Sequence, residues 1–419
     1  MHTATDQRKL LISTTIGSIF EIFDFISFVF LTAILAQVFF PAEYGTSSIW
    51  FTYIAITISY LLRPVGGLVL GHLGDKYGRK SIFTLSLLLM SIPALVIGLL
   101  PTYAHIGYTA TALLILMRIF QGFSVGGEVP GSITYIAEEF KNKNFYFMCA
   151  WLTFGANFAV FFASFSIKLL MLYSSHEFML DYGWRIPFLF GSLLTIIGFY
   201  FRKNIKESES FNEHLNSQSK IPVFELFKDH KKTIINGVML AIIVSITTSV
   251  FHVFLPNLFM TYYHQDGSYA TTIASSGALT MAVMSLGFGY LCKYFRPINI
   301  MTFSLCALLV VYITIFSDAI DLEQHLFAAV IVISFILAGV NGIFFGFLAT
   351  LFTTENRFSG IALCYNLAYI LGAGLTPLWT STILEKTDRY SYILIACIVI
   401  TVLAIINVLT LRKHDTKID

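Results

Sequence analysis

Charged side chains stand inside several long apolar stretches of this sequence. Glu21 and Asp24 lie in the first stretch, Arg63 in the second, and Arg118 and Glu128 in the fourth. A charge at the centre of a bilayer is costly unless it is paired or reached by water, so such residues usually mark ion, ligand or proton sites. A carboxyl group beside an arginine can take up and release one proton as that contact opens and closes.

Helix geometry predicts which of these charges meet. A helix rises about 1.5 Å per residue. Asp24 therefore lies about 20 Å from the first residue of the first span, and Arg118 lies about 15 Å from the first residue of the fourth span, which crosses in the opposite direction. The two levels agree within an apolar core about 30 Å thick, so we pair Asp24 with Arg118 and expect Asp24 to carry a proton. Glu21 lies on nearly the same face, and two such acids titrate as a coupled pair, which leaves the choice between them open. Arg63 and Glu128 lie nearer the inner ends, and we expect a structural ion pair between them.

Arg118 is also the expected anchor for an anionic solute. Its planar guanidinium matches the two oxygens of a carboxylate, and no other basic residue is predicted near mid-depth. Gln121, one turn further along, could either bind the solute or orient Arg118. Polar residues in the later apolar stretches could line the same cavity or join helix to helix; they are His252, Asn341, Tyr365, Asn366 and Tyr369.

The stretches that hold these residues are long enough to cross a membrane. Hydrophobic residues make up 56% of the 419 residues, charged residues make up 12%, and the mean hydropathy is +0.76. A soluble chain carries about 25% charged residues, so the solvent of this one is lipid. About 20 apolar residues cross a bilayer as a helix, which satisfies the backbone internally. Twelve spans of an all-α membrane protein are expected, at residues 10–38, 49–71, 80–100, 108–138, 145–173, 184–202, 233–262, 269–292, 298–317, 325–352, 358–383 and 390–411.

Basic residues predict how the chain sits in the membrane. Most of the 26 Lys and Arg residues fall in loops on one side, whereas the loops at 39–48 and 101–107 contain none. The positive-inside rule then places both termini in the cytoplasm, as in a multi-pass protein of a bacterial inner (plasma) membrane. A polar segment at 203–232 is expected to be a cytoplasmic linker between an N-terminal six-helix half (1–202) and a C-terminal one (233–419).

The two predicted halves are related in sequence. A constant offset of 217 residues relates Gly122 to Gly339 and Glu138 to Glu355, and it relates Arg79 to Arg296. Two six-helix halves related by an axis along the membrane normal are typical of carriers that hold their solute at the midplane between the halves. The sequence therefore predicts two pseudo-symmetric halves around a central site.

Residues 71–80 read GHLGDKYGRK, residues 63–67 read RPVGG, residues 118–128 read RIFQGFSVGGE and residues 183–188 read GWRIPF. The first segment resembles the signature loop between helices two and three of the major facilitator superfamily. The others, with Tyr365–Leu367, resemble its metabolite:proton symporter family, whose members carry proline and betaine, 2-oxoglutarate, citrate or shikimate. The resemblance implies alternating access and proton symport of a small organic carboxylate or zwitterion. It also implies an acid on helix one and an arginine on helix four, as in related sugar–proton symporters.

The signature loop predicts a latch between conformations. Its glycines, Gly71, Gly74 and Gly78, allow a tight turn between closely packed helices. Asp75 can accept hydrogen bonds from the N-terminus of another helix, whose dipole favours an anion. Arg79 can reach Glu138 at the end of the fourth span.

Other function classes fit the sequence less well. No soluble domain, catalytic constellation or Walker loop is visible, so we expect neither an enzyme nor an ATP-driven pump. A proton-driven exporter of the same superfamily stays an alternative, although span five lacks the GxxxGPxxGG-like motif of exporters; a transport-inactive sensor or scaffold is a second one. We expect a monomer whose partners are the solute, protons and the lipid bilayer, with no cofactor, metal or nucleic acid.

Overall fold

The computed structural model of the chain describes residues 4–411, apart from residues 42, 44–46, 78, 141–143, 204–229, 256–266, 318–321, 354–355 and 388–389. The helices before residue 204 are α1 (Ala4–Phe30), α2 (Thr32–Phe39), α3 (Ser47–Tyr77), α4 (Arg79–Leu99), α5 (Tyr103–Ile106), α6 (Tyr108–Glu139), α7 (Phe145–Tyr173), α8 (His176–Phe178), the π-helical turn η2 (Met179–Gly183) and α9 (Arg185–Lys203). We call them the N-terminal half.

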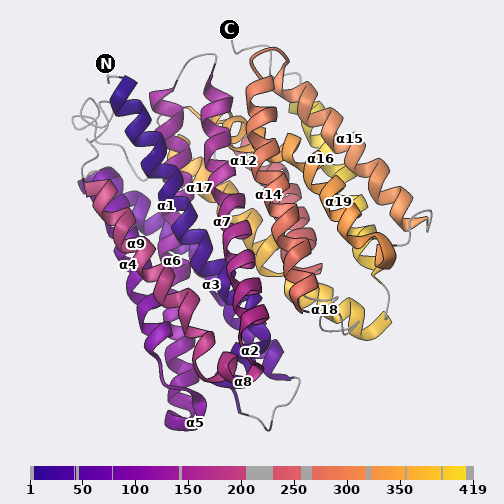
Figure 1. The fold of residues 1–419 in the computed structure, drawn as a ribbon. Helices are drawn as coiled ribbons and strands as arrows, with labels where there is room; N and C mark the ends of the chain where they lie inside the picture. Colours follow the sequence, from indigo (N-terminus) through magenta and orange to yellow (C-terminus); the bar gives the residue numbers. More distant parts are fainter. Residues whose placement is uncertain are drawn as a thin grey trace.

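The C-terminal half follows residue 230. Its helices are α12 (Lys231–Thr248), the π-helical segment η3 (Ser249–Phe254), α14 (Gly267–Leu291), α15 (Pro297–Phe316), α16 (Leu322–Thr350), α17 (Arg357–Tyr369), the π-helical segment η4 (Ile370–Gly374), α18 (Thr376–Thr387) and α19 (Ser391–Leu411). Figure 1 shows the short helices α5 and α8, and helix α18, at the end of the bundle opposite the start of α1.

The described helices account for the predicted membrane spans. Nine are long and apolar enough to cross a bilayer, and the pair α1 and α2, bent by 69°, makes a tenth. The two shorter apolar helices, Leu85–Leu99 and Arg185–Gly198, fall on the third and sixth predicted spans. The all-helical, twelve-span expectation is confirmed, whereas the predicted 203–232 linker lies almost wholly outside the described residues.

Close packing of α3 against α6 brings the two arginine-bearing helices together. A Cβ atom on Gly126 would overlap the backbone carbonyl of Arg63, and one on Gly122 would overlap that of Ser59. Small residues let helix backbones approach in this way in a membrane, where packing rather than the hydrophobic effect holds helices together. Ser59 also donates its hydroxyl to the carbonyl oxygen of Arg118 at 2.9 Å.

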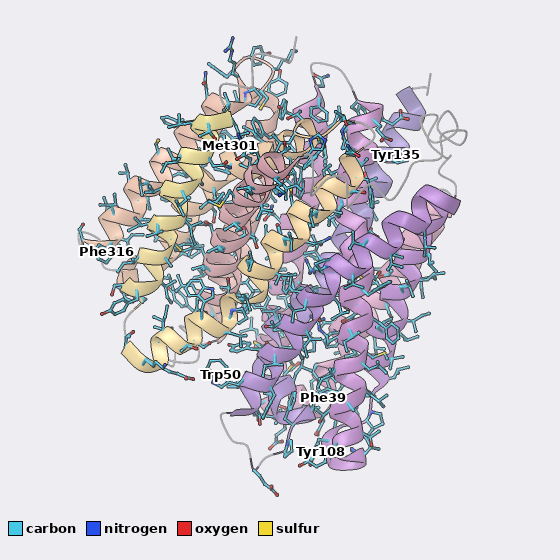
Figure 2. The ribbon with its side chains drawn as sticks, turned by 180° about the vertical axis from the view of Figure 1, so that it is seen from behind. Phe39, Trp50, Tyr108, Tyr135, Met301 and Phe316 are labelled. Atoms are coloured by element: carbon cyan, nitrogen blue, oxygen red, sulfur yellow. The ribbon has the colours of Figure 1, made fainter. Side chains whose placement is uncertain are left out.

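The two halves meet along α3 with α17 and along α7 with α14. The π-helical turn η4 takes part in this contact, because its geometry frees backbone groups for other partners. The hydroxyl of Thr57 donates to the carbonyl of Gly374 at 2.8 Å across the interface, and within the C-terminal half the amide of Ala373 donates to Ser245 at 2.9 Å. Near the α18 end, Trp50 donates to Glu385 at 3.1 Å, and Figure 2 shows Trp50 at the line where the halves meet.

Candidate substrate and proton sites

A cavity of about 100 Å³ lies between the two halves. Helices α1, α3, α6 and α7 line it from one side, and α12, η3, α16, α17 and η4 line it from the other. Of the residues predicted to bind solute, Asn341, Tyr365 and Tyr369 lie on its wall. The volume is that of a small solute with a few waters.

One wall of the cavity carries a guanidinium group surrounded by aromatic rings. Among the described lining residues Arg63 is the one charged side chain. Its Cζ atom lies 4.0 Å from the ring centroid of Tyr60 and 4.8 Å from that of Phe25. On the opposite wall the rings of Tyr365 and Tyr369 stack at 4.1 Å. The cavity therefore offers one fixed positive charge and several π faces.

A second polar cluster lies behind α1, away from the cavity. Gln121 Nε2 donates to Asp24 Oδ2 at 2.5 Å, and Arg118 Nη1 donates to Gln121 Oε1 at 2.8 Å. Asp24 and Gln121 are 1% and 0% exposed. A Cβ on Gly191 of α9 would lie 3.5 Å from Asp24 Oδ1, so that oxygen faces α9. Within the described part of the chain Asp24 Oδ1 has no hydrogen-bond partner, which leaves it free to accept a proton.

Arg118 is buried by aromatic rings. It is fully buried, and its Cζ atom lies 4.1 Å from the Phe28 centroid and 4.6 Å from the Phe25 centroid. Phe25 and Phe28 are one helical turn apart, so both rings face the same guanidinium. Arg118 is not among the described residues that line the cavity.

Comparison with known proteins decides the family. Residues 16–357 match the Major Facilitator Superfamily. The chain belongs to the major facilitator superfamily. It is therefore a membrane transporter and not an enzyme, as the sequence predicted.

Curated relatives of this superfamily member cover nearly its whole length. A putative proline/betaine transporter of Staphylococcus haemolyticus is 31% identical over 416 residues, which are 97% of this chain and 89% of the relative. The proline/betaine transporter of Salmonella typhimurium is 30% identical over 425 residues, 98% of this chain and 84% of the relative. These similarities confirm the predicted resemblance to the metabolite:proton symporter family.

Solved structures confirm the fold. The proton:xylose symporter XylE bound to 6-bromo-6-deoxy-D-glucose superposes with a TM-score of 0.78 at 14% identity and covers 98% of this chain and 96% of its own. The human organic anion transporter MFSD10 superposes with a TM-score of 0.71 at 12% identity and covers 97% of this chain and 100% of its own.

Arg118, the predicted solute anchor, lies behind Phe25 and off the wall of this cavity, where Arg63 is the charged side chain among the described lining residues. A direct contact of Arg118 with solute stays a prediction. The depth estimate put Arg118 at the right level, but depth along a helix does not say which side the side chain faces. Gln121 accepts the hydrogen bond from Arg118 that the orienting role requires, and its binding of solute stays a prediction.

The structure gives Arg63 and Glu128, the predicted ion pair, different neighbours among the described residues. Arg63 turns to the rings of Tyr60 and Phe25, whereas Glu128 accepts a hydrogen bond from Ser86 of α4 at 2.8 Å. The backbones of α3 and α6 touch between these positions, so the two side chains leave on different faces.

Two more residues that were predicted to bind solute form hydrogen bonds between helices. His252 is 1% exposed, and its Nε2 lies 2.7 Å from the hydroxyl of Ser334 within the C-terminal half. Asn366 donates from Nδ2 to the carbonyl of Gly126 at 2.8 Å and so joins α17 to α6. Both are helix-to-helix contacts, the other role foreseen for such residues.

The predicted latch lies largely outside the described residues. The side chains of Glu21, Asp75 and Arg79 are outside them, as is Gly78. Helix α3 runs on to Tyr77, so Gly71 and Gly74 lie inside a helix and not in the expected tight turn. Glu138 lies in the last turn of α6.

Sequence reasoning missed the aromatic members of the site. Phe25 and Tyr60 were not singled out among the 41 Phe and 21 Tyr residues of the chain. A usable signal was their spacing, because Phe25 directly follows Asp24 and Tyr60 precedes Arg63 by one helical turn.

Proposed function

We propose that this transporter is a proton-coupled symporter of a small zwitterion or monocarboxylate, with proline and betaines as the first candidates. The observation that carries the proposal is the guanidinium of Arg63 on the wall of a small cavity between the halves. The relatives named as proline/betaine transporters support the same class of solute.

The cavity wall matches both ends of such a solute. A carboxylate forms two parallel hydrogen bonds with a guanidinium, and Arg63 Nε is buried without a hydrogen-bond partner among the described residues. A substituted ammonium group prefers the faces of aromatic rings, and Tyr365 and Tyr369 present stacked rings on the opposite wall. A dicarboxylate would need a second cation, and the described lining residues offer none.

The cluster of Asp24, Gln121 and Arg118 supports proton coupling. The positive charge of Arg118 stabilises the ionised form of Asp24, and the charge of Arg63 acts on Arg118 in turn. A solute carboxylate on Arg63 cancels part of that charge and so favours a proton on Asp24. Solute and proton then bind together, which is the thermodynamic linkage that a symporter needs.

The orientation follows from the basic loops. We infer a bacterial inner-membrane protein with both termini in the cytoplasm, a cytoplasmic linker at 203–232 and a monomeric carrier. Under this orientation α6 and α3 end on the cytoplasmic side, and α5, α8 and α18 lie outside.

Uptake into proteoliposomes tests the proposal. With an acidic exterior, the protein should accumulate proline or glycine betaine, and a protonophore should abolish the accumulation. Accumulation driven by sodium and insensitive to protonophore would contradict proton coupling. Efflux against the gradient, with no uptake, would favour an exporter, and a protein that moves none of these solutes in either direction would favour a sensor.

Competition by choline tests the role of Arg63. Choline keeps the quaternary ammonium of glycine betaine but lacks its carboxylate. Arg63→Gln should therefore weaken the binding of betaine by roughly tenfold or more, the value of a charge-assisted pair, and leave the weak competition by choline unchanged. Arg296→Gln changes an exposed arginine and is the matched control. Equal loss for betaine and choline would show that Arg63 has a structural role only.

A further inference from the structure

We propose that Phe25 is the positioning residue that couples the substrate site to the proton site. The inference rests on the proposed function and names the side chain through which a solute on Arg63 acts on Asp24.

Among the described residues, Phe25 is the one whose ring lies within 5 Å of the guanidinium carbons of both arginines. Its ring centroid lies 4.8 Å from Cζ of Arg63 and 4.6 Å from Cζ of Arg118. The same ring lines the cavity, and it meets Tyr60 edge-on at 5.0 Å and 78°. Arg63 belongs to the substrate wall and Arg118 to the Asp24 cluster, so Phe25 stands at the border between the two sites.

The ring keeps the two sites apart. Phe25 is 4% exposed and Arg118 is fully buried. With an apolar ring between them, a solute carboxylate on Arg63 cannot pass to Arg118, and a proton on Asp24 cannot exchange directly with the cavity. The solute carboxylate and the proton therefore occupy separate sites and can be bound at the same time.

The ring also links the two arginines. A π face attracts a cation most strongly where water is absent, and this one is shared between two cations of like charge. When a carboxylate draws Arg63 into the cavity, the ring is left to Arg118 alone. The guanidinium of Arg118 then shifts toward Phe25, and Gln121, which holds both Arg118 and Asp24, moves with it.

Phe23 shows why this role is specific to Phe25. Phe23 is equally buried on the same helix, at 1% exposure, but its ring packs on Phe162 and Phe190. No cation contacts it among the described residues. A substitution of Phe23 therefore removes the same volume from α1 without disturbing either arginine.

The test compares Phe25→Leu with Phe23→Leu in proteoliposomes. The readouts are the proton-to-solute flux ratio, the accumulation ratio under an imposed pH gradient, and solute counterflow without a gradient. Phe25→Leu should lower the accumulation ratio by roughly tenfold, since it removes a shared desolvated cation–π contact, while counterflow continues. Phe25→Tyr keeps the ring face and should restore the wild-type flux ratio. Phe23→Leu should keep that ratio as well.

Two results would overturn the inference. One is a wild-type flux ratio in Phe25→Leu, and the other is an equal loss of coupling in Phe23→Leu, which would show an effect of packing volume. If Phe25→Leu does not reach the membrane, Phe25→Met is measured against the same outcomes. A wild-type protein without proton coupling overturns the proposed function and this inference together, whereas coupling retained in the variants overturns the inference alone.

Discussion

Gln121 stands between Asp24 and Arg118 and bonds to both. Its amide nitrogen donates to Asp24 at 2.5 Å, and its amide oxygen accepts from Arg118 at 2.8 Å. The acid and the arginine therefore communicate through one side chain whose amide dipole has a single orientation that suits both.

Replacement of Gln121 by leucine should break this link. Gln121→Leu keeps the volume but removes both hydrogen bonds, and a buried polar group left unsatisfied costs about 1–3 kcal/mol, with a larger cost for a charged group. The melting temperature of the purified protein should fall, and uphill uptake should be lost. The control is Gln37→Leu, because Gln37 is exposed and bonds only within its own helix. Normal uptake by Gln121→Leu would remove Gln121 from the mechanism.

Asp24→Asn should uncouple transport and leave the fold intact. Asparagine can still accept the hydrogen bond from Gln121, but it cannot bind and release a proton at physiological pH. Accumulation against a gradient should vanish, while solute exchange across the membrane continues. The matched control is Glu128→Gln, which neutralises a second buried acid of the N-terminal half that accepts from Ser86. If Asp24→Asn accumulates solute normally, the proton is carried elsewhere, and Glu21 is the next residue to change.

The membrane spans were predictable from the sequence because hydropathy alone sets them. The breaks within the spans could not be predicted in this way. The bend of 69° between α1 and α2 and the π-helical turn at Ile370–Gly374 do not change the mean hydropathy of a span. They depend on tertiary partners, such as the hydroxyl of Thr57 that bonds to Gly374.

Tertiary packing, which the sequence pattern does not report, also explains which predictions about the site agree with the structure. Depth placed Asp24 and Arg118 at one level, and the structure brings them into one cluster. The direction in which each side chain points depends on helix rotation, which follows from packing. Gly122 and Gly126 set that rotation for α6, and it turns Arg118 away from the cavity while Arg63 faces it.

Arg118 should behave as the partner of Asp24 and not as the solute anchor. Arg118→Gln alone leaves a buried carboxylate without its cation, a loss of about 3–5 kcal/mol of stability. The double variant Asp24→Asn with Arg118→Gln removes both charges and should recover most of that stability. Its affinity for solute, measured by thermal shift or equilibrium binding, should be close to that of Asp24→Asn. A double variant that is stable but binds no solute would return the anchor to Arg118.

Asn366 should act as a clasp between the halves beside the cavity, in the C-terminal part of α6, where Val125 and Val129 on either side of Gly126 line the cavity. Its side chain, from α17, donates to the carbonyl of Gly126 at 2.8 Å, close to Gly67 of α3. This bond crosses the interface that must open when the cavity is exposed on that side. Asn366→Ala should therefore shift the population toward the state that is open there. The shift should be roughly two- to tenfold, the value of one hydrogen bond of about 0.5–1.5 kcal/mol.

Cysteine labelling measures this shift. Ser132 lines the cavity from α6, so Ser132→Cys can be labelled with a membrane-impermeant reagent applied to either side of the membrane. Asn366→Ala should speed labelling from the side on which α6 ends and slow it from the other side. Asn407→Ala is the matched control, because Asn407 donates to the carbonyl of Asn236 at 2.9 Å within the C-terminal half, where no gate opens. Labelling rates that change equally in the two variants would show that Asn366 only stabilises the helix packing, because a clasp must bias one side of the membrane over the other.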